Sequence, residues 1–293
     1  GTVESTMHYA DWRNIESVNM PMQLEYRVDG QLIRQEQRNN VGLTFATEVK
    51  NINYSAPLQI ASFSRGWNMA HWFLRRIALG GPADTDQSYP VDFLQVGEGI
   101  FQLLGSSNHT VVIETDDGLV IADAPLYPSR SVAILEALEE RWPNKPVQQV
   151  ILTHHHYDHS GGVTAYATAG IPITTHTDNA SFFTDALAKQ GLGTVPISGV
   201  GDVARMLIGG RTIEIYDVPT SHATAMLIVY VPDEELVFNS DLYSPGRATQ
   251  HQLWASELLQ AIKFRGLPVK QFVGGHGRGA GSLEDLETIA NTA

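Results

Sequence analysis

Cysteine is absent from this chain of 293 residues. Its absence excludes disulfides, zinc sites built from thiolates and a cysteine nucleophile, and it leaves the redox compartment undetermined. Long apolar runs are also missing, because no stretch approaches the roughly 18 residues that a membrane-spanning helix needs. Positive charge is scarce, with 19 Lys and Arg against 32 Asp and Glu, for a net charge of −13. This balance argues against nucleic acid as the main partner and leaves a small-molecule substrate as the expectation.

The composition that remains is that of a folded protein. Hydrophobic residues make up 43% of the chain and charged residues 17%, which predicts a packed core rather than disorder. The length suits one large domain, or a catalytic domain with an appendage. We place the boundary at the polar linker 84–90, which gives a β-rich segment over residues 1–90 and a catalytic domain over residues 91–293.

The first 90 residues predict a small sheet followed by a helix. Apolar and polar residues alternate over 22–28, Asp29-Gly30 is a hairpin turn signal, and Leu32 opens a return strand. A further extended piece is expected over residues 43–49. The aromatic-rich stretch 65–79 reads as a helix, either as a wall of a substrate pocket or simply packed on its neighbour.

From residue 91 onward, strands and helices alternate, which predicts an α/β fold with the sheet inside and the helices outside. Strands are expected at 100–104, 110–115, 119–122, 147–152, 171–175, 211–218, 226–231, 235–238 and 271–273. Helices are expected at 129–142, 162–169, 179–190 and 255–264, and at the carboxyl terminus after Ser282. Residues 191–201 are glycine-rich and read as a loop that could border a substrate entrance. Ser129 and Ser282 are the predicted N-caps of their helices.

The stretch Thr153–Gly162 concentrates potential metal ligands. His154, His156, Asp158 and His159 follow the apolar run 150–152 and precede two glycines. A strand that ends in such a turn presents several side chains at one rim, and imidazole and carboxylate are ligands that zinc takes. A solvated histidine tract, which binds metal without a fold around it, is the alternative.

Three later residues stand in the same context, where an apolar run meets a turn. They are His222 after Pro219-Thr220-Ser221, Asp241 after Asn239-Ser240, and His276 after Gly274-Gly275. Each one alone is a weak signal, but their order after the first cluster is not accidental.

The complete set resembles the metallo-β-lactamase superfamily, whose signature His-x-His-x-Asp-His is matched by residues 154–159. The resemblance covers roughly residues 93–293 and includes each ligand position of the branch that binds two metals. It implies a four-layer αβ/βα sandwich with the metals at one sheet edge. It further implies one metal on His154, His156 and His222, a second on Asp158, His159 and His276, and Asp241 bridging the two. Asp123 matches a family carboxylate that supports the ligands from behind.

The resemblance implies a hydrolase with two Zn²⁺, although Fe or Mn in the same site remains possible. Two cations that share a water make hydroxide available near neutral pH, and Asp158 is a candidate proton shuttle. Because β-lactamases of this superfamily lack a bridging Asp, Asp241 points to the branch of glyoxalase II and the lactonases. We expect an ester or lactone substrate. Phosphodiesterase, thioesterase or β-lactamase activity, a mononuclear iron oxygenase and a non-catalytic metal-binding module remain open alternatives.

Other polar and aromatic residues carry weaker expectations. Tyr243 either places its phenol near the substrate oxygen or packs with Trp254. His109 either lines the pocket or lies on the surface, and His155, Tyr157, His176 and His251 are expected outside the ligand set. The pattern from Tyr9 to the hairpin at Asp29-Gly30 resembles the end of exported half-barrel domains that precede some bacterial zinc hydrolases. That resemblance, with a chain that begins Gly1-Thr2-Val3 and shows no signal peptide, leads us to expect a periplasmic or secreted protein processed at its amino terminus.

Overall fold

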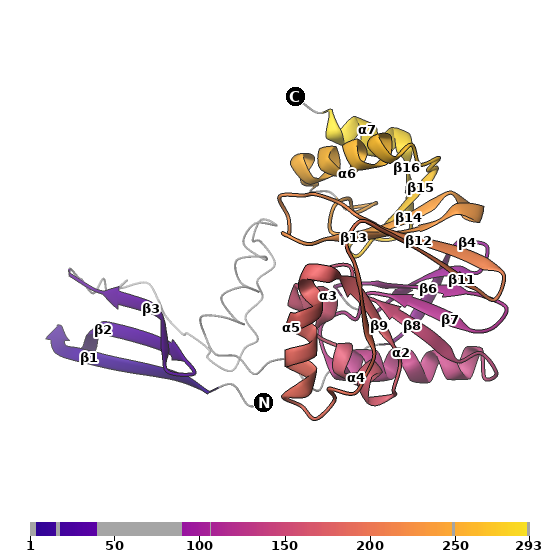
Figure 1. Cartoon of the computed structure of the whole chain (residues 1–293). Coiled ribbons are helices and arrows are strands. Elements are labelled where there is room, and N and C mark those ends of the chain that lie inside the picture. The colour runs from indigo at the N-terminus through magenta and orange to yellow at the C-terminus, as the bar shows by residue number, and fades with distance from the viewer. Residues whose placement is uncertain (1–3, 16–17, 40–89, 106, 248–249, 292–293) are drawn as a thin grey trace, which may run out of the picture. The chain divides into compact units, whose positions relative to one another are not determined.

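The structure of the protein is a computed structural model that describes residues 4–15, 18–39, 90–105, 107–247 and 250–291 (Figure 1). The chain divides into two compact units, residues 1–83 and 84–293, and each is described by itself. The division at residues 90 and 91 drawn from the sequence stays a prediction. Among the described residues, no helix is long and apolar enough to cross a membrane.

The first unit contains a three-stranded antiparallel sheet in the order β1-β2-β3. Its strands are β1 (Ser5–Ile15), β2 (Val18–Val28) and β3 (Gln31–Gln37). Asp29 and Gly30 join β2 to β3 with φ values of 47° and 79°, the left-handed conformation that a two-residue hairpin turn requires. The predicted hairpin is therefore confirmed, whereas β1 was not predicted. The strand expected at 43–49 and the helix expected at 65–79 lie outside the described residues.

The second unit is built on two sheets. The first has the order β10-β9-β8-β7-β6-β5-β4 and the second β11-β12-β13-β14-β15-β16. The strands of the first are β4 (Asp92–Gly97), β5 (Ile100–Leu104), β6 (Thr110–Glu114), β7 (Leu119–Ala122), β8 (Val147–Ile151), β9 (Ile173–His176) and β10 (Ile197–Val200). Those of the second are β11 (Val203–Ile208), β12 (Arg211–Asp217), β13 (Leu227–Val231), β14 (Leu236–Ser240), β15 (Gln271–Gly274) and β16 (Ala280–Ser282).

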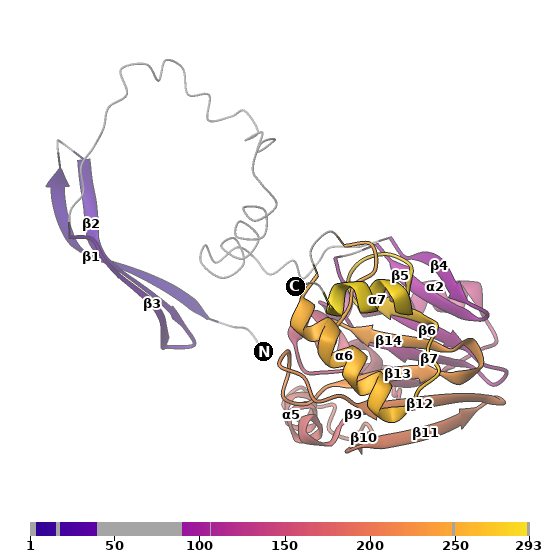
Figure 2. The same cartoon turned by 90° about the horizontal axis from the view of Figure 1, so that it is seen from above.

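Helices cover the outer face of each sheet. They are α2 (Pro128–Arg141), α3 (Tyr157–Ser160), α4 (Val163–Thr168), α5 (Thr177–Ala188), α6 (Gln252–Arg265) and α7 (Leu283–Ala290), with a short 3-10 turn at Pro232–Glu234. Figure 2 shows α6 and α7 next to each other across the second sheet. The four layers that the resemblance implied are thus confirmed.

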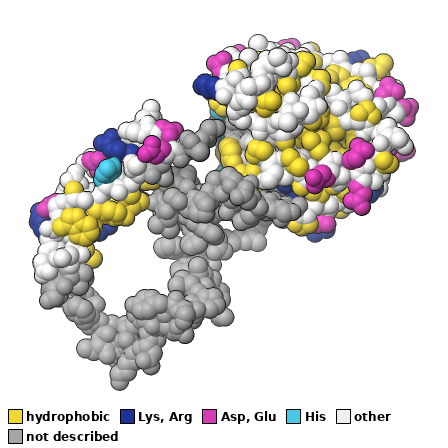
Figure 3. All heavy atoms as spheres, turned by 90° about the horizontal axis from the view of Figure 1, so that it is seen from below, with side chains coloured by type: hydrophobic (Ala, Val, Ile, Leu, Met, Phe, Trp, Pro, Cys, Tyr) yellow, Lys and Arg dark blue, Asp and Glu magenta, His cyan; other side chains and the backbone are white. Residues whose placement is uncertain are grey.

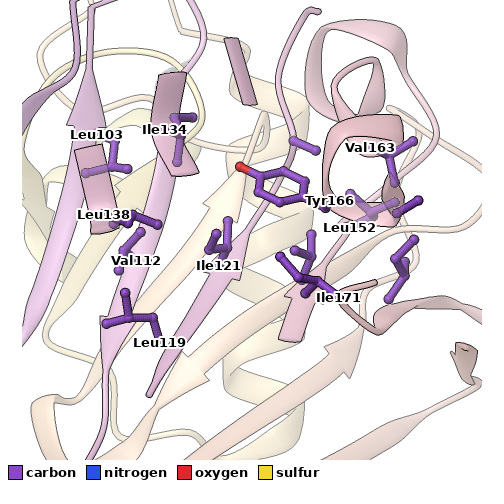
Figure 4. Packing of buried hydrophobic residues seen from close by; sticks show 14 of the residues in the cluster. Leu103, Val112, Leu119, Ile121, Ile134, Leu138, Leu152, Val163, Tyr166 and Ile171 are labelled. Carbon is purple, nitrogen blue, oxygen red and sulfur yellow. The ribbon is translucent and has the colours of Figure 1, made fainter. Parts of the chain in front are cut away.

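The layering follows from strands that are apolar on both faces. In β13, Leu227, Val229 and Val231 pack between the two sheets, whereas Ile228 and Tyr230 pack under α6 and α7. A side-chain period of two makes this division unavoidable for a strand that has no polar face. On the other side of the molecule, a third cluster lies between the first sheet and its helices, where Ile134 and Leu138 of α2 meet Leu103 and Val112 (Figure 4).

The sequence misplaced some local features. Ser129 is not the N-cap of α2, because Pro128 occupies the first helical position and Tyr127 precedes it. In α2, Val132 is 45% exposed, and the buried positions include Arg130. The Arg130 guanidinium donates to the carbonyl oxygens of Pro90 (3.0 Å) and Leu104 (2.6 Å), so the inward face of this helix includes a cation.

Edge strands were the second feature that the sequence did not predict. Residues 191–201, expected as a loop, include β10, and strands β4, β11 and β16 were not predicted. All four are edge strands of their sheets, where the apolar pattern is short or interrupted. The N-cap at Ser282 is confirmed: its hydroxyl accepts from the Asp285 amide (3.1 Å), and the Asp285 carboxylate accepts from the Ser282 amide (2.9 Å).

We predict that Phe238→Ala destabilises the second unit strongly and that Phe264→Ala does not. Phe238 of β14 is 1% exposed in the core between the sheets, so its truncation should cost about 3–5 kcal/mol. Phe264 is 89% exposed, and its truncation should change the free energy of unfolding by less than about 0.5 kcal/mol. Urea denaturation of both variants measures the difference, and equal effects would contradict the layer assignment.

Candidate metal centre

Strand ends bring the candidate ligands together. The residues Asp123, His154, Asp241 and His276 follow the carboxyl ends of β7, β8, β14 and β15, respectively. β7 and β8 are parallel neighbours, as are β14 and β15, so each pair ends on the same edge of its sheet. Two backbone hydrogen bonds link these edges, from the His109 amide to Gly275 (2.7 Å) and from the Leu227 amide to Thr153 (2.8 Å). The strand ends of both sheets therefore lie together, and the carboxyl ends of strands are where α/β proteins commonly bind ligands.

The stretch after β8 folds into the turn that the sequence predicted. His156 precedes the single-turn helix α3, which returns Asp158 and His159 toward His154. His154 and His159 are fully buried, whereas His156 and Asp158 are partly exposed. One side of the cluster is therefore buried in the protein, and the other side is open to solvent.

The seven predicted ligands separate into two groups that share one residue. The first group is His154, His156, His222 and Asp241, and the second group is Asp158, His159, His276 and Asp241. Within each group, one ligand atom from every residue lies within 4.8 Å of the others. We call these seven residues the ligand cluster.

The Asp241 carboxylate divides between the two groups. Its Oδ2 lies 2.8 Å from His222 Nε2 and 3.4 Å from His154 Nε2. Its Oδ1 lies 2.9 Å from both His159 Nε2 and His276 Nε2. One oxygen therefore faces each group, which is the arrangement that a carboxylate bridging two cations requires.

The spacing of the ring nitrogens fits tetrahedral cation sites. Nε2 of His154 and Nε2 of His222 lie 3.3 Å apart, and those of His159 and His276 lie 3.4 Å apart. Ligands at the 2.0–2.1 Å that zinc prefers stand about 3.3–3.4 Å from one another in a tetrahedron. Asp241 Oδ1 is buried and makes no hydrogen bond. The donor set therefore fits two divalent cations of zinc's preference.

Electrostatics in the cluster are dominated by burial and by Asp241. Burial and the neighbouring imidazoles lower the pKa of His156 to about 4, and burial also lowers the pKa of His154. Burial opposes charge on His159, but Asp241 and Asp123 outweigh it and raise its pKa well above the ordinary value. Burial alone would raise the pKa of Asp241, yet the surrounding histidines, His159 first, hold it well below the ordinary value. Asp241 is thus a carboxylate anion that attracts positive charge from both sides.

Asp123 supports both groups from beneath. Its Oδ2 accepts from His159 Nδ1 (3.1 Å) and from the Ser240 hydroxyl (2.8 Å), and its Oδ1 accepts from the Thr153 amide (2.9 Å) and hydroxyl (2.8 Å). The Thr153 hydroxyl proton is thereby engaged, so the contact of Thr153 Oγ1 with His154 Nδ1 (3.0 Å) makes that ring nitrogen the donor. His159 and His154 consequently keep Nε2 free for a cation.

The backbone near Asp123 is held in an unusual conformation. Asp123 and Ser240 have φ values of 69° and 53°, a left-handed conformation that non-glycine residues seldom adopt and that often marks functional sites. Gly275 meets a different constraint, because a Cβ there would lie 2.6 Å from His159 Cε1. A larger residue at position 275 would displace the His159 ring.

Two supporting residues were not identified from the sequence. The Asn108 amide nitrogen donates to Asp158 Oδ2 (3.0 Å), and its oxygen accepts from the Ser107 hydroxyl (2.7 Å), which fixes its orientation. The pairing of Val111 with Ala122 places residue 110, not residue 108, opposite Asp123, so the strand register alone did not identify Asn108. Glu257 of α6 accepts from the Thr220 hydroxyl (2.7 Å) and the Ser221 amide (3.0 Å) and so holds the loop that carries His222. The role of Glu257 follows from the packing of α6 against this loop, which the sequence does not reveal.

Tyr243 does not join the ligand cluster. It is 3% exposed and belongs to the core under α6 and α7. The centroid of its ring lies 6.1 Å from that of Phe272. The chain turns after Asp241, and Tyr243 then packs on the face of the second sheet that α6 and α7 cover, away from the ligand cluster. The proposed contact of its phenol with a substrate therefore receives no support from the structure.

The remaining histidines take several positions. His109 is buried rather than on the surface, and burial, with His276 nearby, lowers its pKa to about 4. His176 accepts from the Asp178 amide at the start of α5 and lies 3.4 Å from Asp217. His155 packs against Phe182, and His251 stacks on Trp254. None of these four belongs to either candidate metal group among the residues that the structure describes.

Known proteins resemble this chain in sequence. The chain is 28% identical over 188 residues to the alpha subunit of 2,4-dinitroanisole O-demethylase from Nocardioides sp. (strain JS1661), covering 62% of this chain and 54% of that one. It is 25% identical over 150 residues to a metallo-beta-lactamase type 2 from Bacillus sp. (strain 170), covering 51% of this chain and 56% of the relative. The chain thus spans about half the length of each of these curated relatives.

Solved structures agree on the fold. A metallo-beta-lactamase from Pontibacter korlensis superposes with a TM-score of 0.56 at 21% identity, covering 69% of this chain and all of that one. The family model for the metallo-beta-lactamase superfamily matches residues 104–276, which include the whole ligand cluster and more than half of the chain. This protein belongs to the metallo-beta-lactamase superfamily.

Proposed function

We propose that this protein is a di-zinc hydrolase that cleaves an ester or a lactone. Membership of the superfamily supports hydrolysis by a metal-binding site in general terms. The single observation that carries the finer proposal is the Asp241 carboxylate, whose oxygens face different histidine pairs at 2.8 and 2.9 Å. A site for one cation has no need of that division.

A pair of divalent cations, when bound, supplies Lewis acidity for the substrate oxygen and makes hydroxide available near neutral pH. The residues of the chain then have separate tasks. His154, His156 and His222 would hold one cation, while Asp158, His159 and His276 would hold the other. Asp241 would fix the two at a common spacing and offset their charge.

Asp158 is the candidate for moving a proton. Its side chain is 37% exposed at the rim, so it can meet both the substrate and solvent. The Asn108 amide holds Asp158 Oδ2, the oxygen that lies 3.6 Å from His159 Nε2 and 3.7 Å from His276 Nε2. Oδ1 is then the oxygen able to take or give a proton at the leaving group.

The side chains around the ligand cluster suit a neutral substrate. The chain carries a net charge of −13, and the ligand cluster contacts Thr, Ser, Asn, Asp and Trp side chains around it. Because two bound cations would themselves attract an anion, net charge does not exclude a phosphodiester or a carboxylate-bearing β-lactam. An uncharged ester or lactone is the substrate that needs no further cationic side chain. One relative is named as an O-demethylase of an aryl methyl ether, so aryl ethers belong in the same assay.

The proposal is tested by metal analysis and a substrate panel on the full chain. We expect two zinc ions per chain and hydrolysis of esters or lactones in preference to thioesters, phosphodiesters, sulfate esters, aryl methyl ethers and β-lactams. A single redox-active iron with oxygen consumption would support the oxygenase alternative instead. Two bound metals without turnover of any substrate would support a metal-binding module.

His156→Ala should lower both metal content and hydrolysis. Loss of a direct ligand should reduce kcat/KM by more than about 100-fold, because loss of an outer partner alone costs about 10–100-fold. His155→Ala is the matched control for metal content, since His155 is adjacent in sequence but packs on Phe182 outside the ligand cluster. Unchanged metal content and activity in His156→Ala would show that the assigned site is wrong.

Asp123→Asn should weaken metal binding by about 10–100-fold, because the His159 ring loses its carboxylate acceptor. Asp217→Asn is the control, since it changes another Asp–His contact, 3.4 Å from His176, that lies outside the cluster. Competition with a zinc chelator measures both affinities. If the two variants retain zinc equally well, Asp123 does not orient the ligands.

A further inference from the structure

Six aromatic rings form a continuous row across the first group. The row runs Phe182, His155, His156, His222, Trp254, His251, and neighbouring ring centroids lie 5.9, 5.0, 4.7, 4.4 and 3.8 Å apart in that order. We call this row the aromatic belt. Each spacing is within the range of direct aromatic contact.

Only the two central rings have a task in metal binding. His156 and His222 are candidate ligands, whereas the outer four rings belong to neither metal group. Phe182 comes from α5, and Trp254 comes from α6, so both anchors stand on regular helices. The belt therefore extends beyond the ligands on both sides, and it includes Phe182 and Trp254, whose side chains do not bind zinc.

The outer rings are open to a ligand. Phe182 is 52% exposed, while its neighbour Phe183 is 2% exposed in the core, so α5 directs one phenylalanine inward and the other toward His155. Trp254 is half-buried against the core under α6, and His251 stacks on it and is exposed. Exposed rings that are already fixed by packing lose little freedom when a flat partner stacks on them.

The composition of the aromatic belt suits an uncharged partner. Figure 3 shows Asp and Glu side chains along the margin of one face of the second unit, in keeping with the net charge of −13. The belt offers π-faces and imidazole rings rather than Lys or Arg side chains. Such a surface matches a neutral, planar group better than a carboxylate or phosphate.

We infer that the aromatic belt binds an aryl group of the substrate next to the bond that is cut. Phe182 and Trp254 are then specificity-determining residues, and the preferred substrates are uncharged esters or lactones that carry an aromatic ring. This inference rests on the proposed hydrolase function for its kinetic test, but the binding of the ring itself does not.

The kinetic test compares esters of one acid with alcohols of similar leaving ability. Benzyl, cyclohexylmethyl and ethyl acetates separate aromaticity from size and from apolar area. In the wild type, we expect kcat/KM to follow that order, with the benzyl ester preferred over the cyclohexylmethyl ester by about 3–10-fold, the value of one aromatic contact. No preference for the benzyl ester would overturn the inference.

Substitutions in the belt test whether its rings cause the preference for the benzyl ester. Phe182→Ala and Trp254→Ala should each raise KM for the benzyl ester about 3–10-fold and leave the ethyl ester within about 2-fold. Trp254→Phe should restore most of the preference, because it keeps a ring beside His222. Phe264→Ala is the control, since Phe264 is also exposed on α6 but lies outside the belt. If the alanine variants lower kcat for all three esters alike and lose zinc, these residues only support the metals and the inference fails.

A second measurement needs no hydrolysis. Saturation-transfer NMR on the zinc-loaded full chain compares benzyl alcohol with cyclohexylmethanol, in the wild type and in the Phe182→Ala/Trp254→Ala double variant. We expect stronger saturation of benzyl alcohol in the wild type and loss of that difference in the double variant. If this result appears without any ester turnover, the proposed function fails and the aryl site stands. If esters are cleaved but neither alcohol is distinguished, the aryl site fails and the hydrolase stands.

Discussion

The buried Asp241 carboxylate is the constraint on which the rest of this structure depends. Its oxygens face two separate pairs of imidazole nitrogens, and it is 7% exposed in its side chain. A buried anion without compensation is costly, and removing one partner of such a group leaves the other unpaired. The strand ends and the hydrogen bonds to the histidines place imidazole nitrogens on both sides of this one group.

The supporting structure acts mainly on ring orientation. Asp123 receives hydrogen bonds from His159, Ser240 and Thr153, and through Thr153 it also sets the tautomer of His154. One carboxylate behind the ligands thus directs nitrogens from both groups toward Asp241. The left-handed backbone at Asp123 and Ser240 shows that this arrangement is maintained against local conformational preference.

The sequence predicted the parts of the site that depend on local order. The turn at residues 154–159 follows a strand in the chain itself, and buried strands such as β7 and β13 carry uninterrupted apolar runs that identify them. The sequence did not predict the direction of a side chain that follows a turn. Tyr243 lies two residues beyond Asp241 but turns into the core under α6.

The sequence also did not predict contacts between elements that lie far apart in the chain. Glu257 supports the His222 loop across 36 residues, and Phe182 and Trp254 reach the ligand rim from helices whose packing the sequence does not specify. The edge strands β10 and β11 have short or one-sided apolar patterns, so tertiary pairing rather than local preference defines them.

The central claim is that one carboxylate joins two cation sites. An anomalous-difference map from crystals of the zinc-loaded chain, recorded on both sides of the zinc absorption edge, tests it directly. The account predicts two peaks about 3.5–4 Å apart, one on either side of Asp241, the first next to His154, His156 and His222 and the second next to Asp158, His159 and His276. A single peak, or two peaks that do not share Asp241, would contradict it.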